Sequence, residues 1–207
     1  MALLAQLRRM STVLWRNRWA LLFAETNGSQ IVEFAVSLPL LMVLIVGTFD
    51  FGSAFTVKQK LAYAAREGAR VASNQPTTDL SLSGPPCNAP ASVCAIRDVV
   101  DQNLLAGKVN DCGLAGANAT ATPPLAWSFT PNTNCAGTLT LTIDRGYTYT
   151  ATLAAPFQTA YTIEGTKVTL SYPYKWQFNK VIVFVAPGAT YAGVSQITSF
   201  GLMQNLN

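Results

Sequence analysis

The stretch ETNGSQIVEFAVSLPLLMVLIVG, from Glu25 to Gly47, places six polar or small residues in front of a long apolar run. No charged residue occurs between Phe34 and Phe49. A helix needs about 20 mostly apolar residues to cross a hydrocarbon core of about 30 Å, so this run predicts one membrane-spanning helix. Pro39 lies inside the run and is expected to bend the helix.

Positive charge is concentrated in front of this run. The four arginines before residue 29 account for most of the net charge of +4. The remaining chain has no basic stripe of the kind that a nucleic-acid surface needs, so no nucleic-acid partner is expected. Lysines and arginines follow the run as well as precede it, so the positive-inside rule alone does not orient the helix.

The chain contains no histidine. Ser-His-Asp and Cys-His chemistry are therefore excluded, and the commonest metal ligand is missing. Asp98 and Asp101 have a helical i, i+3 spacing that could hold a cation, but a solvated helix face is the favoured interpretation. We expect no enzyme activity, no cofactor and no metal site.

Four cysteines, Cys87, Cys94, Cys112 and Cys135, all lie beyond the apolar run and form no C-x-x-C pair. An even number favours two disulfides in an oxidising compartment over four buried free thiols in a cytosolic protein. Three connectivities exist; the short loops favour Cys87–Cys94 with Cys112–Cys135. The cysteines also place the C-terminal part outside the cytoplasm and the leader inside.

The helix is expected to continue beyond the membrane, over residues 29–74, and to end before Pro76. A stripe of mostly small residues follows its helical repeat: Val57, Leu61, Ala65, Gly68 and Ala72. Such a stripe suits close packing between helices. Two alternatives remain at this point, because the stripe can pack against other subunits or against the chain's own downstream domain.

The remainder predicts an α+β domain. A second helix is expected over Ala91–Ala106, ended by Gly107. The segments LAWSF, TLTLTID, YTYTATL and KVTLSYPY are rich in Thr, Tyr and β-branched residues and predict an antiparallel sheet of about four strands. VIVFVAP is expected to be a further short strand or buried segment, and residues 189–204 have weak helical character. The expected parts are 1–28, a basic leader; 29–75, the long helix; and 76–207, the exported domain.

The sequence GSQIVEF resembles the processing site of a type IV prepilin. Such a site has a glycine, a short mature N-terminus, a glutamate at the fifth mature position and an aromatic residue at the sixth. Here these are Gly28, Ser29, Glu33 and Phe34. The longer run VEFAVSLPLLMVLIVGTFDFG, with the later block AAREGAR, resembles the TadE-like family, minor pilins or pseudopilins of the bacterial tight-adherence (Flp) system. The resemblance covers about residues 28–72.

This resemblance implies that a prepilin peptidase cuts after Gly28, that the leader is lost, and that Ser29 begins the mature chain. Glu33 would lie about 10.5 Å from a helix centre at residue 40, inside a hydrocarbon half-thickness of about 15 Å. It would pair there with the N-terminal amine of a neighbouring subunit; alternatively, the helix sits lower and Glu33 reaches the headgroups. Asp50, about 15 Å from the same centre, is expected at the interface without a role.

The expected protein is a single-pass protein of the bacterial inner membrane with a cytoplasmic N-terminus and an extracytoplasmic domain. Its expected partners are the prepilin peptidase, other pilin subunits, the inner-membrane assembly platform and the lipid bilayer. An alternative is an uncleaved membrane anchor for a binding module that uses Tyr147, Tyr149, Tyr172, Tyr174 and Trp176. An enzyme with a signal anchor is disfavoured, because no histidine and few acids are present.

Overall fold

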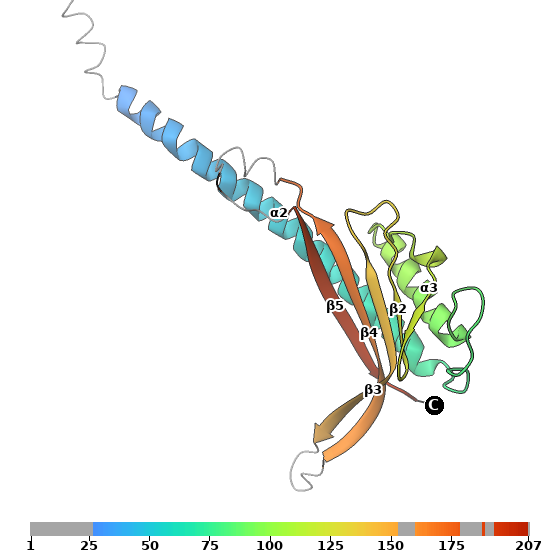
Figure 1. Cartoon of the computed structure of the whole chain (residues 1–207). Helices are drawn as coiled ribbons and strands as arrows, with labels where there is room; N and C mark the ends of the chain where they lie inside the picture. Colours follow the sequence, from blue (N-terminus) through green and yellow to red (C-terminus); the bar gives the residue numbers. More distant parts are fainter. Residues whose placement is uncertain (1–26, 153–159, 179–187, 189–192, 207) are drawn as a thin grey trace, which may run out of the picture.

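A computed structural model describes residues 27–152, 160–178, 188 and 193–206 of the chain (Figure 1). It has an α+β fold, as expected: one long helix, a second helix and a five-stranded antiparallel sheet. The leader, with its arginines, and the VIVFVAP segment lie outside the described residues. One half of the long helix protrudes, and the other half packs with the second helix and the sheet (Figure 1).

Helix α2 spans Asn27–Asn74 and has 48 residues, which corresponds to about 72 Å at 1.5 Å per residue. Pro39 lies inside the helix, which continues through it. The helix ends two residues before Pro76, as expected. Within the described part of the chain it is the one helix long and apolar enough to cross a membrane, with a mean hydropathy of 2.2 over its most apolar window.

The C-terminal half of α2 packs against the chain's own domain. Its small-residue stripe is buried there, with Leu61, Ala65 and Ala72 fully inaccessible to solvent. A Cβ on Gly68 would lie only 2.6 Å from Cγ2 of Val100, and a Cβ on Gly201 would collide with the carbonyl oxygen of Ala65. The small residues therefore serve a close intramolecular contact, which decides between the two alternatives left by the sequence.

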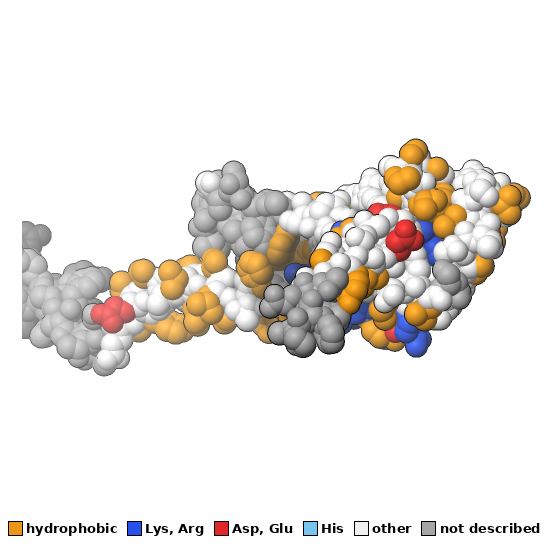
Figure 2. Space-filling model, turned by 90° about the horizontal axis from the view of Figure 1, so that it is seen from below, with side chains coloured by type: hydrophobic (Ala, Val, Ile, Leu, Met, Phe, Trp, Pro, Cys, Tyr) orange, Lys and Arg blue, Asp and Glu red, His pale blue; other side chains and the backbone are white. Residues whose placement is uncertain are grey.

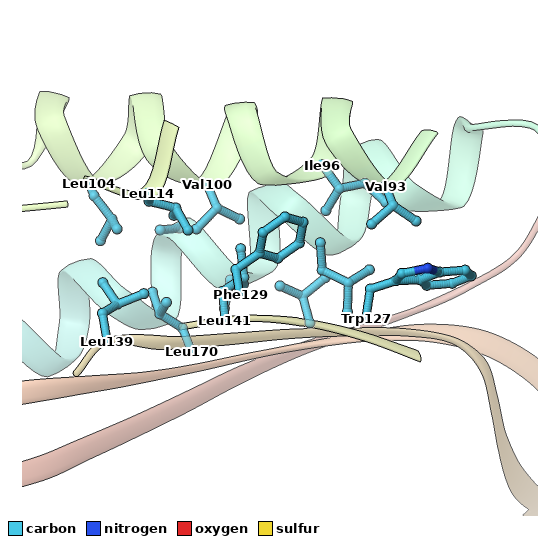
Figure 3. Close-up of a cluster of buried hydrophobic side chains, with 14 of the residues drawn as sticks. Val93, Ile96, Val100, Leu104, Leu114, Trp127, Phe129, Leu139, Leu141 and Leu170 are labelled. Atoms are coloured by element: carbon cyan, nitrogen blue, oxygen red, sulfur yellow. The ribbon is translucent and has the colours of Figure 1, made fainter. Parts of the chain in front are cut away.

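Helix α3, Ala91–Ala106, has the predicted bounds. It ends at Gly107, whose N–H donates to the carbonyl of Asn103 at 3.0 Å. One apolar face of α3 points toward the sheet and α2 (Figure 3). The buried residues of that face are Val93, Ile96, Val100 and Leu104.

The sheet has the order β1-β2-β3-β4-β5, with every neighbouring pair antiparallel. One face packs on the helices and carries Phe129, Leu141 and Leu170 (Figure 3). The opposite face carries mainly threonine and serine, so the central strands alternate between buried and accessible residues as half-buried strands do. The strands are β1 Thr120–Thr122, β2 Ala126–Phe129, β3 Thr140–Thr152, β4 Ala160–Lys175 and β5 Val194–Gln204.

The expected helical character of residues 189–204 is wrong where the structure describes them. Residues 194–204 form β5, which pairs along its whole length with β4, from Lys175↔Val194 to Gly165↔Gln204. Alternation along β5 is interrupted by Gly201, which gives α2 room to approach. The strand is thus specified by its tertiary partners more than by its own periodicity.

Both expected disulfides are present. Cys87–Cys94 joins the loop before α3 to the first turn of α3, with Cα atoms 5.9 Å apart. Cys112–Cys135 joins the loop after α3 to the connection between β2 and β3, with Cα atoms 5.4 Å apart. The pairing is the one that closes the shorter loops, and it holds irregular segments at both ends of α3.

A buried arginine of β3, Arg145, binds backbone carbonyls at the C-terminal end of α2. Arg145 lies in β3, where the register with β4 shifts between Asp144 and Tyr147. Its guanidinium donates to the carbonyls of Ala72 at 2.7 Å, Gln75 at 3.0 Å and Pro76 at 3.1 Å. Burial lowers the pKa of Arg145 from its ordinary value. The three carbonyls lie in the last turn of α2 and in the two residues that follow its end, where a cation is favoured by the helix dipole.

Replacing Arg145 should therefore weaken the domain strongly. We expect Arg145→Ala to lower the free energy of unfolding by about 2–4 kcal/mol, because three charge-assisted hydrogen bonds are lost and a large buried side chain is removed. Urea unfolding of the full chain in detergent, followed by tryptophan fluorescence, measures this. Arg70→Ala is the matched control: its side chain is 65% exposed and bridges Glu67 at 2.9 Å, so a change under about 1 kcal/mol is expected. Equal effects of the two variants would contradict the assigned capping role.

Candidate functional site

The processing motif lies at the start of α2. Gly28, Glu33 and Phe34 are exposed, and Phe34 retains 62% of its accessible surface. Among the described residues, no heavy atom lies within 4 Å of the position that a Cβ would take on Gly28. The bond between Gly28 and Ser29 lies in the first turn of the helix, where backbone N–H groups have no intrahelical acceptor. Among the described residues, nothing therefore blocks the approach of another protein to the backbone at Gly28.

Apolar side chains cover the protruding half of α2. Figure 2 shows hydrophobic side chains along this half, with an acidic side chain near its end and no Lys or Arg on the visible face before the folded domain. Water solvates such a surface poorly, and its size exceeds what scattered exposed apolar residues account for. The most exposed large members are Ile31, Val32, Phe34, Val36, Leu40, Leu44 and Phe49.

Two carboxylates bracket this apolar surface. Glu33 and Asp50 lie about 26 Å apart along the helix axis at 1.5 Å per residue, close to the ~30 Å of a hydrocarbon core. Glu33 is exposed, whereas Asp50 is fully buried. The two acids therefore have different environments, although both lie at ends of the apolar run.

Asp50 fastens the end of β4 to α2. Its Oδ1 accepts the N–H of Gln177 at 3.1 Å, and its Oδ2 accepts the N–H of Phe178 at 3.3 Å. Ser53, one turn later, donates to the carbonyl of Asp50 at 2.8 Å and lies within hydrogen-bond distance of the Tyr174 hydroxyl. The sequence prediction gave Asp50 no role, and the structure corrects it. A carboxylate that interrupts an apolar helix was the available signal.

An aromatic cluster strengthens the same junction. The ring of Trp176 packs edge-on against Phe51 and against Tyr174, at centroid distances of 5.3 and 5.2 Å. Its Nε1 donates to Oγ of Ser195 at 2.7 Å. The cluster joins α2 to the end of β4 and the start of β5. The five aromatic residues considered for a binding module are all buried or half-buried, so none presents a fully exposed ring.

The acidic pair on α3 differs from the expectation of a solvated face. Asp98 accepts from the Arg97 guanidinium at 2.6 and 2.9 Å, whereas Asp101 is buried. Burial, and then the neighbouring Asp111, raise the pKa of Asp101 to about 6. The described residues contain no group of three His, Cys, Asp or Glu side chains that could hold a metal ion. This carboxyl is therefore best described as a buried structural acid.

Asp101 should make stability depend on pH. A folded-state pKa of about 6, above the ordinary 3.8, means that the folded chain binds the proton more tightly than the unfolded chain does. Its contribution to stability is therefore present at low pH and is lost as the pH rises from about 4 through 6. Asp101→Asn should remove this dependence, since the amide stays neutral and can donate to Asp111. Unfolding measured at several pH values checks it, with Glu164→Gln at an exposed residue of β4 as the control; an Asp101→Asn variant that keeps the native slope would contradict the assignment.

Comparison with known proteins was made over the whole chain. Residues 28–70 match the family model described as TadE-like protein. No curated protein and no solved structure matches the chain. The match begins at the glycine of the processing motif and covers most of α2, but none of α3 or the sheet. Residues 28–70 thus form a TadE-like segment, which confirms the resemblance over this part of the chain.

Proposed function

We propose that this chain is a minor pilin or pseudopilin that takes part in assembly of a tight-adherence (Flp) pilus and is processed after Gly28 by a prepilin peptidase. The observation that carries the proposal is that the TadE-like match begins at Gly28, within the first turn of a helix whose N-terminal half carries exposed apolar side chains. Its role is structural, so it needs no catalytic site.

The apolar half of α2 would lie in the inner membrane, with the leader in the cytoplasm and the folded domain outside. The exposed apolar side chains support the first point, because lipid or other helices must cover them. The two disulfides support the second, because disulfides persist in oxidising compartments. The four leader arginines would then interact with the anionic cytoplasmic headgroups.

Processing would break the peptide bond between the Gly28 carbonyl and the Ser29 nitrogen by adding water. The leader departs with a new carboxylate, and Ser29 keeps a free amine that is largely protonated near neutral pH. Glycine at this position allows a protease to approach the backbone closely. The charge of the helix start thereby changes from a neutral amide to an ammonium group.

Glu33 would balance that new charge. A carboxylate costs about 2.5–3.5 kcal/mol at the centre of a bilayer on insertion scales, and less toward the edge. An ammonium group from a neighbouring processed subunit, placed beside Glu33, offsets the burial of both charges. The exposed position of Glu33 leaves it accessible to such a neighbour.

Blocking the approach to Gly28 should prevent processing. In a host that contains the prepilin peptidase, we expect Gly28→Leu to keep its leader, because the side chain obstructs the backbone. Intact mass and N-terminal sequencing would then show Met1 or Ala2 first, whereas the native chain begins at Ser29. Gly47→Ala, at another open position on the same helix, should be processed normally. A native chain that retains its leader in this host would refute the proposed processing and favour an uncleaved anchor.

Neutralising Glu33 should leave processing unchanged but weaken assembly with other pilins. We expect Glu33→Gln to be cut like the native chain but to be recovered with other pilins about tenfold less, the factor that corresponds to a loss of about 1.4 kcal/mol of pairing. Crosslinking in membranes followed by immunoprecipitation measures the recovery. Ser37→Ala is the control, because the Ser37 hydroxyl donates only to its own helix, to the Phe34 carbonyl at 3.1 Å. Normal recovery of Glu33→Gln would mean that the carboxylate has no pairing role.

A further inference from the structure

A lysine-lined pocket lies at the end of the folded domain from which the protruding half of α2 leaves. It has a volume of about 330 Å³. Its walls come from three elements whose ends meet there: α2 at Val57 and Lys60, the turn after α3 at Lys108, and the end of β4 at Lys175. In Figure 1 the C-terminal ends of α3 and β4 both point toward the protruding half of α2.

The pocket is positively charged. Lys60, Lys108 and Lys175 line it, and no Asp or Glu does so among the described residues. The ion pairs found in the described part of the chain involve only Arg70–Glu67 and Arg97–Asp98, so none of these three amines forms a direct ion pair with a described carboxylate.

Hydrogen bonds of the Asn110 side chain hold one wall of the pocket in place. Nδ2 of Asn110 donates to the carbonyl of Asn134 at 2.8 Å, and its Oδ1 accepts the N–H of Cys112 at 2.9 Å. The Cys112–Cys135 disulfide holds the same two loops together. Asp111 follows Asn110, but its Oδ2 is occupied by the N–H groups of Gly113 and Leu114, each at 3.1 Å. The wall is therefore held by bonds that do not depend on a bound ligand.

The rim of the pocket reaches the level of Asp50. Gln177 lines the pocket, and its N–H is bound by the Asp50 carboxylate at 3.1 Å. Lys60 lies about 15 Å farther along the helix axis at 1.5 Å per residue. If the apolar run spans a hydrocarbon core of about 30 Å, the headgroup layer begins near Asp50 and extends roughly 5–7 Å beyond it. The Cα of Lys60 is thus about 8–10 Å above this layer, a gap that its long side chain can narrow. Lys175 is nearer, because it precedes the rim residue Gln177 by only two positions.

We propose that this pocket binds the phosphate headgroup of an anionic phospholipid in the leaflet from which α2 emerges. The inference rests on the membrane placement in the proposed function. Lysine amines are compact, flexible donors that bind phosphate as point charges. A membrane leaflet presents such phosphates at high local density beside the rim, whereas free phosphate must be collected from solution. The contact holds the folded domain against the membrane surface.

The test compares lipid retention by two full-length variants in detergent. Native mass spectrometry would count bound phosphatidylglycerol and, separately, phosphatidylcholine. The leader arginines and the apolar half of α2 are identical in all samples, so differences between variants report on the substituted side chains. The pocket variant replaces three lysines by glutamine: Lys60, Lys108 and Lys175. The control variant removes the same charge from side chains that do not line the pocket: Arg66, Arg70 and Lys167.

The pocket variant should retain phosphatidylglycerol at least about fivefold less than the native chain, since each lysine near an anionic surface contributes measurably. The control variant should retain as much phosphatidylglycerol as the native chain, and neither set of substitutions should change the retention of phosphatidylcholine. Salt at 0.5 M should reduce the difference in phosphatidylglycerol retention between the two variants. Equal retention by the two variants, at unchanged melting temperature, overturns the proposal. So does inorganic phosphate that binds the native chain while phosphatidylglycerol fails to displace it. Processing at Gly28 is scored separately, so either result leaves the pilin assignment intact.

Discussion

A buried carboxylate, Asp50, marks the point at which α2 passes from its exposed apolar half into the folded domain. Its two oxygens hold the backbone N–H groups of Gln177 and Phe178, so the end of β4 cannot separate from the helix without leaving a charge unsolvated. Removing a partner of a buried charge is costly, while the paired arrangement is tolerated. The junction therefore fixes how far along the helix the domain begins.

The C-terminal half of α2 packs very closely against the sheet and α3. At Gly201 the strand lies so near the helix that no Cβ would fit, and at Gly68 the helix lies equally near Val100 of α3. At the far end of the helix, Arg145 binds the carbonyl of Ala72 and those of Gln75 and Pro76, which follow α2. Protein interiors packed in this way transmit displacement instead of absorbing it. A pull on the apolar half would therefore move the whole domain as one body.

The elements with strong local signals could be predicted from the sequence. The apolar run, the helical stripe that follows it, and α3 with Gly107 at its end appear in the structure with nearly the expected bounds. The strand β5 could not be predicted, because VSQITSFGLMQ has an interrupted alternation and pairs with residues about thirty positions away. The burial of Asp50, Asp101 and Arg145 was missed for a related reason: their partners are distant backbone and side-chain groups that no local period reveals.

In the proposed pilin role, the two halves of α2 would impose opposite demands on a subunit that leaves the membrane. The apolar half gains stability only when lipid or other helices cover it, so transfer into a filament requires neighbouring helices to replace lipid on its exposed side chains. Charged groups set the direction of that exchange. Under the two proposals, Glu33 near the start of the helix would favour a neighbour that brings a positive charge, whereas the lysines of the pocket would favour an anionic leaflet. Extraction must therefore exchange one electrostatic partner for another, and the balance depends on salt far more at the solvated lysines than at a pair surrounded by hydrocarbon.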